Sequence, residues 1–316
     1  MNKKMAIRDA YGQALKELGA VNEKVVALEA DVGSSTKSVL FGREFPNRYF
    51  NVGISELNMV NMSVGLALEG YIPYVNTFAV FLTARALDPI QSLIAYDRLK
   101  VRLCGTYCGL SDSYDGASHQ AITDIAAMRA IPGMTVISVS DPEETRKAVL
   151  ALADYEGPAY LRLSRASVPF IYNKDSSFEI GRGIVLKEGL DVVMIASGTV
   201  LHRVLEASEL LAEEGISAAV VDMHTIQPLD SDLIAEYARK TGAVLTVEEH
   251  SIHGGLGSAV AEAVAAKCPV PVDILGLDSF AESGDLDQLM DKYGYSVENI
   301  AQCAKEVINR KKIPTE

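Results

Sequence analysis

A single carboxylate near the start of a long apolar segment is the first candidate for chemistry. The segment NVGISELNMVNMSVGLALEG, residues 51–70, carries Glu56, and the next charge along it is Glu69. Burying a charge is costly unless it has a partner, whereas a glutamate in the first turn of a helix is favoured by the helix dipole. Glu56 is therefore either an ordinary first-turn residue or a semi-buried carboxyl that shares a proton with a ligand nitrogen.

Two further segments carry residue types that could act on a ligand. In NTFAVFLTARAL, Phe78 and Phe81 are three residues apart and can share one helical face. They are either ordinary core or a flat slot that stacks an aromatic heterocycle. In GLSDSYDGASHQ, Asp115 and His119 are four residues apart in a Gly/Ser-rich loop. An Asp–His pair suits hydroxyl recognition and proton transfer, although a solvated turn remains the alternative.

The elements that must position these residues alternate between strand-like and helical patterns. Such alternation predicts βαβ units and a parallel sheet with helices on both faces. Ligands then sit on the loops at the carboxyl ends of the strands, where Glu56, Phe78 and His119 are all expected. We predict strands at 25–29, 72–76, 100–104, 135–139 and 160–163, and helices at 56–68, 80–95, 120–130 and 142–153.

The regular alternation breaks at SRASVPFIYNKDSSFEIGRG, residues 164–183, and a second alternating set follows. We therefore predict a first domain over 1–172, a linker over 173–189 and a second α/β domain over 190–316. The second set comprises strands at 192–196, 217–222, 244–247 and 270–275, and helices at 200–214, 232–239, 257–266 and 296–311.

Composition narrows the class of protein. The chain has 316 residues, a formal net charge of −13 and four cysteines. The acidic balance argues against a nucleic-acid binder and gives no support for binding an anionic membrane. No apolar run is long enough to span a bilayer, and the N-terminus does not resemble a signal peptide, so we expect a cytoplasmic protein. The cysteines do not have zinc-site spacing.

Several segments, taken together, resemble one family. RYFNVGISELNMVNMSVGLALEGYIPYVNTFAVF, DGASHQAITDIAAMRAIPGMTVISVSDPEE, LRLSRASVP and VEEHSIHGGLGSAVAE resemble, in order and across nearly the whole chain, the C-terminal half of a transketolase. More closely, they resemble the separate C-terminal subunit of split transketolases. The resemblance implies a pyrimidine-binding domain for thiamine diphosphate followed by a smaller α/β transketolase C-terminal domain.

The resemblance also implies a partner. In the family, a diphosphate-binding domain carries a GDG motif and an asparagine that hold Mg²⁺ and the phosphates, and this sequence has no such motif. A separate N-terminal diphosphate-binding subunit would then supply Mg²⁺ or Ca²⁺, and we expect an α2β2 assembly. The implied activity is transfer of a two-carbon ketol (glycolaldehyde) unit from a ketose donor to an aldose acceptor.

Cofactor roles carry over residue by residue. Glu56 matches the glutamate that hydrogen-bonds N1′ of the aminopyrimidine and promotes the imino tautomer, whose 4′-nitrogen removes the proton from the thiazolium C2. The cofactor then performs the carbanion chemistry. Phe78 and Phe81 match the aromatic pair around the pyrimidine. Asp31 and Val32 match residues near the cofactor at the domain interface.

Substrate roles carry over in the same way. His119 and Asp115 match the residues that contact the hydroxyls of the ketose donor, and His119 is also expected to be catalytic. Arg8, Ser35 and Arg165 match residues that grip the terminal phosphate of the substrate, as guanidinium–phosphate pairing allows.

The sequence departs from the family at the expected phosphate ligand. Where relatives read a triplet that begins with histidine, this chain reads Tyr107-Cys108-Gly109, and Ser113-Tyr114 replace the usual small or acidic pair. Tyrosine donates a neutral hydrogen bond, not a cationic one. We therefore predict ordinary ketol transfer with a donor or acceptor terminus that is not the usual sugar phosphate. A modified or sulfonated sugar, or a looser phosphate site, would fit.

Three alternatives remain open. A 1-deoxyxylulose-5-phosphate synthase and the β subunit of a 2-oxoacid dehydrogenase E1 share the architecture and the glutamate, and both release CO₂ from a 2-oxoacid. The third alternative is a non-catalytic regulatory or scaffolding module that has kept the fold.

Overall fold

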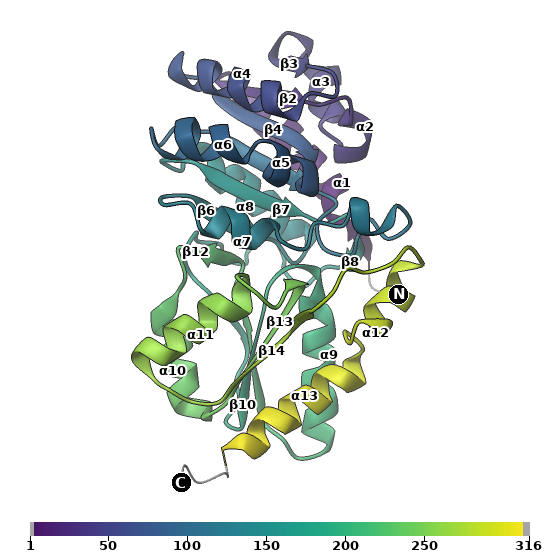
Figure 1. Ribbon diagram of the computed structural model, residues 1–316, viewed down its shortest axis with the longest axis vertical. Helices are drawn as coiled ribbons and strands as arrows, with labels where there is room; N and C mark the ends of the chain where they lie inside the picture. Colours follow the sequence, from purple (N-terminus) through teal and green to yellow (C-terminus); the bar gives the residue numbers. More distant parts are fainter. Residues whose placement is uncertain (1–2, 312–316) are drawn as a thin grey trace.

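The computed structural model describes residues 3–311, which form two α/β domains stacked along the long axis of the molecule (Figure 1). A seven-stranded sheet of order β12-β6-β7-β5-β4-β2-β3 lies at the centre of the first domain, and every neighbouring pair is parallel except β12–β6. Its strands are β2 (Val25–Glu29), β3 (Tyr49–Asn51), β4 (Ile72–Phe78), β5 (Arg102–Thr106), β6 (Thr135–Ser138), β7 (Ala159–Leu163) and β12 (Thr225–Gln227).

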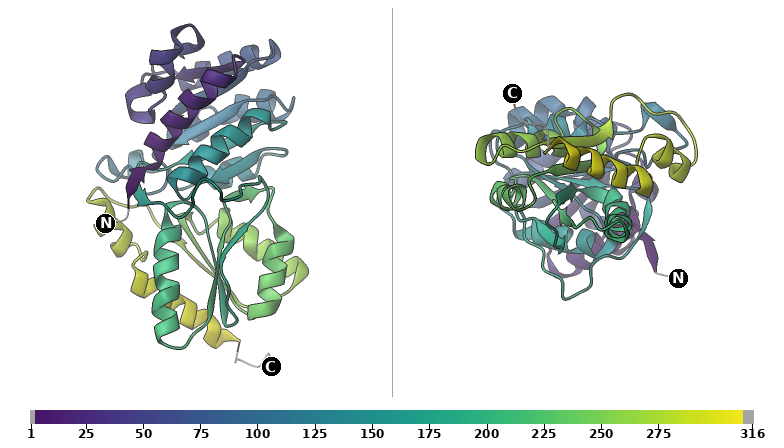
Figure 2. Two further views of the ribbon diagram at one scale, coloured as in Figure 1. Left: turned by 180° about the vertical axis from the view of Figure 1, so that it is seen from behind. Right: turned by 90° about the horizontal axis from the view of Figure 1, so that it is seen from below.

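Helices cover both faces of this sheet, as the alternating pattern predicts. On one face, α1, α3 and α8 bury Tyr11, Phe41 and Leu152 against the strands, and Figure 2 shows α1 and α8 crossing this face. On the other face, α4, α5 and α7 bury Met59 and Leu82. The helices are α1 (Ile7–Val21), α2 (Gly33–Thr36), α3 (Val39–Glu44), α4 (Glu56–Leu68), α5 (Ala79–Arg85), α6 (Leu87–Pro89), α7 (Asp124–Arg129) and α8 (Pro142–Asp154).

The second domain repeats this plan around a five-stranded sheet of order β14-β13-β10-β11-β9. Helices α9 and α13 pack on one face and α10 and α11 on the other (Figure 1). The strands are β9 (Ile184–Lys187), β10 (Val192–Ala196), β11 (Ala218–Asp222), β13 (Val244–Ser251) and β14 (Val272–Leu277). The helices are α9 (Leu201–Glu213), α10 (Ser231–Thr241), α11 (Leu256–Lys267), α12 (Leu286–Lys292) and α13 (Val297–Arg310). A two-stranded antiparallel sheet of β1 (Lys4–Ala6) and β8 (Ser167–Pro169) lies near the junction.

The predicted α/β architecture is confirmed, with two corrections to helices of the first domain. The helix predicted over 120–130 is shorter and begins only at Asp124, as α7. The single helix predicted over 80–95 is divided into α5, α6 and the π-helical segment η2 (Ile90–Ala95). Pro89 accounts for the interruption, because proline has no N–H to donate and disfavours helical geometry in the residue before it.

The two domains share strands and core, so the junction is not a simple linker. Strand β12 follows the second-domain strand β11 in sequence but pairs with β6 of the first sheet, and β9 forms within the segment 173–189 that we predicted as a linker. The domain limits predicted from the sequence, 1–172, 173–189 and 190–316, therefore stay a prediction. One hydrophobic cluster contains Met134 of the first domain together with Met223 and Ile226.

A buried arginine reinforces this junction. Nε of Arg162, in β7, lies 2.7 Å from Oδ2 of Asp124, and its Nη2 donates to the carbonyl oxygens of Ala121 and Glu249 at 3.1 and 2.8 Å. Both members of the ion pair are buried. Since Glu249 belongs to the second domain, this network fixes the two sheets relative to one another.

Among residues 3–311, no helix is long and apolar enough to cross a membrane.

Candidate active site

The carboxyl edge of the first sheet brings together most of the side chains singled out in the sequence. Phe78 ends β4, Tyr107 directly follows β5, and Arg165 follows β7 two residues after its last member. Arg8 joins them from the first turn of α1. The carboxyl edge of a parallel sheet is the usual place for a ligand, so the topology alone places these residues at a functional position.

Glu56 has a cation beside it that the sequence did not reveal. It begins α4, is 5% exposed, and its Oε1 accepts a hydrogen bond from Nη1 of Arg85 at 2.8 Å. Within residues 3–311 this is the only hydrogen bond to the carboxylate. The side chain of Arg85 is 51% exposed and its guanidinium lies 4.0 Å from the centre of the Phe81 ring. The one signal for Arg85 was its position four residues after Phe81, on the same face of α5.

The aromatic residues form one cluster, which Arg85 links to Glu56. The ring centres of Phe78 and Phe81 are 5.9 Å apart and tilted by 33°. Tyr107 extends the cluster, with its ring centre 4.4 Å from that of Phe78. His119 meets Phe81 edge-on at 5.2 Å and Phe78 at 6.1 Å. Both phenylalanines are half-buried, so their rings keep surface for a ligand to contact.

Tyr107 is held in a conformation that is rare for a bulky residue. Its φ is +62°, in the left-handed region, which costs on the order of 1–3 kcal/mol away from glycine. The ring is 5% exposed, and the guanidinium carbons of Arg8 and Arg165 lie 5.2 and 5.3 Å from its centre. Backbone strain of this kind concentrates at functional sites.

Arg8 links this tyrosine to the helix that follows β2. Its Nη1 donates to the hydroxyl of Tyr107 and to the carbonyl oxygen of Ser35 at 3.2 Å. Its Nε is buried without a hydrogen-bond partner among the described residues. The structure thus places Arg8 and Arg165 beside the phenol of Tyr107, and Arg8 links it to Ser35; these three were predicted to recognise a substrate terminus.

The loop that carries Asp115 and His119 is supported by the second domain. The N–H of Gly284 donates to the carbonyl oxygen of Ser113 at 2.9 Å, and Nε2 of Gln120 donates to the carbonyl oxygen of Glu282 at 3.2 Å. Gly116, with φ of +75°, lies so close that a Cβ atom there would be 2.3 Å from Oγ of Ser283. The second domain therefore fixes the height of this loop above the sheet.

Within that loop, the two predicted residues differ in exposure. Asp115 is exposed, whereas His119 is half-buried, and its Nδ1 lies 2.9 Å from Oγ of Ser118. Asp112, which we did not single out as a binding residue, is fully buried, and its Oδ1 lies 3.4 Å from Nη1 of Arg165. Burial, followed by the nearby Asp115 carboxylate, raises the pKa of Asp112 to about 6.

Asp31 and Val32 occupy a neighbouring part of the same edge. Oδ1 of Asp31 accepts from the side-chain amide of Asn51 at 3.1 Å, and the N–H of Val32 donates to Oε2 of Glu29 at 2.6 Å. Among the described residues, neither makes a hydrogen bond to the aromatic cluster. Glu29, which sequence reasoning missed, is 3% exposed, and burial raises its pKa while the backbone N–H groups of Val32 and Gly33 oppose the shift.

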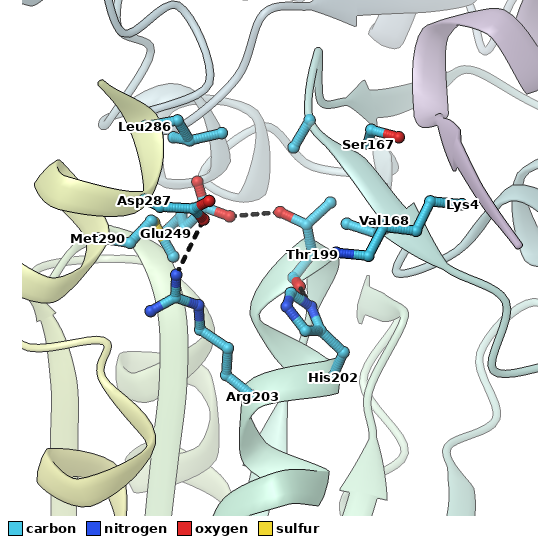
Figure 3. A pocket seen from close by; sticks show the side chains of 11 residues that line it. Lys4, Ser167, Val168, Thr199, His202, Arg203, Glu249, Leu286, Asp287 and Met290 are labelled. Atoms are coloured by element: carbon cyan, nitrogen blue, oxygen red, sulfur yellow. Dashed lines mark hydrogen bonds and ion pairs between the residues drawn. The ribbon is translucent and has the colours of Figure 1, made fainter. Parts of the chain in front are cut away.

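The pocket in Figure 3 lies elsewhere, at the junction between the domains. Its volume is about 80 Å³. Its polar side chains largely bind one another: the Thr199 hydroxyl donates to Oε1 of Glu249, and Nδ1 of His202 lies 2.6 Å from the Thr199 carbonyl oxygen. Arg203 pairs with Asp287 at 3.1 Å. Glu56 and Phe81 do not line this cavity.

Beside Glu56, the surface of α4 and its neighbour carries exposed apolar side chains. Ile54 is 76% exposed and Leu57 is 50% exposed, although both flank a buried carboxylate. Monomeric proteins seldom expose contiguous apolar patches of this kind, which mark interaction surfaces. Further exposed apolar side chains lie on α4, on the segments α6 and η2 that contact it, and directly after η2: Met62, Leu68, Leu87, Leu93 and Tyr96. We refer to these residues, with Ile54 and Leu57, as the apolar patch.

The cysteines and carboxylates give no sign of a metal centre in the part of the chain that the structure describes, where no group of three or more potential ligands is arranged to hold an ion. Cys104 and Cys108 are free and buried, and burial raises the pKa of each thiol to about 12. Since the thiolate is the reactive form, this burial gives neither thiol the character of a reactive cysteine.

Comparison with known proteins gives a consistent result. Residues 3–170 match the family model described as the pyrimidine binding domain of transketolase, and residues 181–300 match the transketolase C-terminal domain. A putative transketolase C-terminal section from Methanocaldococcus jannaschii is 41% identical over 96% of both chains. A 6-deoxy-6-sulfo-D-fructose transketolase subunit from Clostridium sp. (strain MSTE9) is 37% identical, over 96% of this chain and 95% of that one.

A solved structure agrees with this result along the whole chain. It is described as a split gene transketolase, inactive beta4 tetramer, and superimposes with a TM-score of 0.91 at 44% identity. The alignment covers 98% of this chain and 100% of that one.

Proposed function

This chain belongs to the transketolase family, and we propose that it is the C-terminal subunit of a split transketolase that transfers a two-carbon ketol unit from a ketose to an aldose. The observation that carries the proposal is the unbroken line of contacts from Glu56 through Arg85 and Phe81 to His119. This line joins a buried carboxyl, an aromatic surface and an imidazole that we propose binds substrate hydroxyls, along one sheet edge.

The family implies thiamine diphosphate, and the residues of this edge fit its aminopyrimidine ring. Glu56 has one oxygen occupied by Arg85, so its other oxygen is available to hold a proton shared with a ring nitrogen. Phe78 and Phe81 would fix the plane of the ring through their exposed surfaces. When bound, the cofactor supplies the carbanion chemistry, and this chain supplies the orientation of the ring and the control of its proton.

Arg85 would act on Glu56 as a positioning residue. A charge-assisted hydrogen bond of 2.8 Å holds the carboxylate in one rotamer. Because the guanidinium also stacks on Phe81, the carboxyl and the aromatic surface keep a fixed relation to each other.

The substrate would extend from His119 toward Tyr107. His119 and Asp115 are the proposed hydroxyl contacts, and Arg8, Ser35 and Arg165 surround the proposed terminus. The phenol of Tyr107 adds a neutral donor where relatives carry a histidine, so this end offers less positive charge than a site with three cations. We therefore propose a donor or acceptor whose terminus is not the usual phosphate. The relative named for 6-deoxy-6-sulfo-D-fructose makes a sulfonate the first terminus to test.

A second subunit would complete the site. The apolar patch beside Glu56 supports this, because it leaves the expected cofactor position next to an uncovered surface. The proposed partner is a diphosphate-binding subunit that brings Mg²⁺ or Ca²⁺, in an α2β2 assembly.

The test is reconstitution. The chain is co-expressed with a separate diphosphate-binding transketolase subunit, supplied with thiamine diphosphate and Mg²⁺, and screened against ketose donors by mass spectrometry. We expect two-carbon transfer to an aldose without CO₂ release. Pyruvate-dependent CO₂ release would instead support a deoxyxylulose-phosphate-synthase-like or 2-oxoacid-dehydrogenase-like function. A strong preference for xylulose 5-phosphate over non-phosphate ketoses would refute the modified terminus.

A further inference from the structure

Asp112 presents a buried negative charge to the end of the site that Arg8 and Arg165 surround. Its side chain has no solvent exposure, and its Oδ1 lies 3.4 Å from Nη1 of Arg165. Its Oδ2 is buried without a hydrogen-bond partner among the described residues. Such a carboxyl is costly to bury, so its presence beside a substrate-facing arginine needs an explanation.

The two arginines differ in whether a carboxylate neutralises their positive charge. Arg8 makes no ion pair within residues 3–311, and its Nη1 donates only to the neutral Tyr107 hydroxyl and the Ser35 carbonyl oxygen. Arg165 is tied to the loop twice, because its side chain pairs with Asp112 and its backbone N–H donates to Oγ of Ser111 at 3.2 Å. Above its pKa, Asp112 therefore cancels one of the two positive charges around the Tyr107 ring.

We propose that Asp112 is a specificity-determining residue, which lowers the positive charge at this end of the site and so favours a terminus with one negative charge over a dianionic phosphate. The inference rests on the proposed function, because it assigns this end of the site to the terminus of the sugar. The side chain of Arg165 remains 39% exposed while paired, so it can contact a ligand without leaving Asp112.

A charge series on one carbon skeleton tests the proposal. Fructose, 6-deoxy-6-sulfofructose and fructose 6-phosphate carry zero, one and nearly two negative charges at pH 7.5. In the complex with the partner subunit, Asp112→Asn is expected to raise kcat/KM about tenfold for the phosphate and about threefold for the sulfonate, mainly through KM, and to leave fructose unchanged. Asp112→Ser, which removes the charge with a smaller side chain, should give the same order.

Two controls separate charge from structure. Glu236→Gln, at an exposed position on α10, should leave all three values unchanged. In an Arg165→Met background, Asp112→Asn should have no effect on kcat/KM. The positive charge that Asp112 neutralises is then already absent. An equal change for all three donors, or no change, would overturn the proposal.

Binding measurements keep this result independent of turnover. Calorimetric Kd values for the same three sugars should shift in the same order on Asp112→Asn. If the wild-type complex transfers no ketol unit from any donor, the proposed function fails. If instead the Kd values change without regard to ligand charge, the role of Asp112 fails.

Discussion

The carboxyl edges of the two sheets carry similar polar side chains, but these side chains have different hydrogen-bond partners. At the first edge, Phe78 and Phe81 are half-buried, Arg85 is half-exposed, and Nε of Arg8 has no hydrogen-bond partner among the described residues. These side chains keep surface and hydrogen-bonding capacity for a ligand. The line of contacts from Glu56 to Tyr107 runs along this edge, and the second domain contacts the edge through the loop of Asp115 and His119.

At the second edge, the corresponding side chains form hydrogen bonds with other groups of the protein. Glu248 accepts from the N–H groups of Leu256 and Gly257, each at 2.7 Å. Glu249 accepts from the N–H of Leu110 at 3.3 Å, and Nε2 of His250 accepts from the N–H of Ala126 at 3.3 Å. Since Leu110 and Ala126 belong to the first domain, this edge works as a joint.

The difference shows that a parallel sheet does not by itself create a reactive site. Both edges carry carboxylates and a histidine, and those of the second edge lie at the end of β13 itself. The two edges differ in which segments of the chain contact their side chains. Leu110 and Ala126 of the first domain and the start of α11 satisfy the second edge. The first edge instead lies next to the apolar patch.

The largest expected effect removes the carboxyl of the open edge. In the complex with the partner subunit, Glu56→Ala is expected to lower ketol transfer by about 10²–10⁴-fold, since a positioned proton-transfer group contributes on this order. Thiamine diphosphate binding, measured by calorimetry, and thermal unfolding should change far less. Glu56→Gln keeps the size and should be similarly inactive. Unchanged turnover in either variant would contradict the role of Glu56.

A change at the joint should act on stability. Arg162→Met removes the partner of the buried Asp124 and is expected to lower the free energy of unfolding by about 3–5 kcal/mol. Arg146→Met, which breaks the exposed pair with Glu17, should cost less than about 1 kcal/mol. Denaturant unfolding measures both. Equal losses in the two variants would show that the joint does not depend on this ion pair.

The joint should also respond to pH through Asp222. Burial raises the pKa of Asp222 to about 6, and raises that of Glu144 as well. The hydroxyl of Ser140 lies 2.9 Å from Oδ2 of Asp222 and 2.7 Å from Oε2 of Glu144, and its single proton can be donated to only one of them at a time. Asp222 also accepts from Tyr172 at 2.7 Å. Because the folded pKa lies above the ordinary value, the folded state holds the proton more tightly. The associated stability is present at low pH and is lost as the pH rises through about 6.

Asp222→Asn, which keeps the acceptor and cannot ionise, measures this contribution. Relative to the variant, the wild type is expected to lose roughly 2–3 kcal/mol of unfolding free energy between pH 4 and pH 7. Glu236→Gln is a control at an exposed carboxylate. A constant difference between wild type and Asp222→Asn across this range would rule out the titration.

The smallest effect concerns the contact through which the second domain supports the open edge. Gly116→Ala would bring a Cβ to 2.3 Å from Ser283, whereas Gly133→Ala, at a similar φ of +78°, meets nothing within 4 Å. Both should lose about 1 kcal/mol of stability from the positive φ. Only Gly116→Ala should also raise KM for the ketose donor, because it displaces the loop of Asp115 and His119. Equal KM values in the two variants would show that the second domain does not control the position of this loop.

Elements with clear periodicity were predictable from the sequence. The limits of the helix over 56–68 and of the strands over 25–29 and 192–196 are confirmed, because each has an unambiguous apolar pattern. Strand β12 was not predictable, since its three residues carry no period and its partner β6 is far away in sequence. The grouping of Arg8, Tyr107 and Arg165 followed from the family resemblance and the order of strands.

The energetic details of the site were not available from the sequence. Arg85 lies 29 residues after Glu56 and meets it only through the packing of α5 against α4. The left-handed backbone of Tyr107 has no sequence signal, because bulky residues seldom adopt it. From the sequence, Asp112 looked like part of a solvated turn. The structure shows that it is buried and pairs with Arg165.

Strand β12 decides where this chain can be divided. A fragment that ends at residue 172 would lack Thr225–Gln227, the strand that closes the β6 side of the first sheet. It would leave the backbone groups of β6 unpaired, which is a template for association with other chains. A chain break between the two domains would therefore expose this edge, so we expect the two domains to fold as one piece.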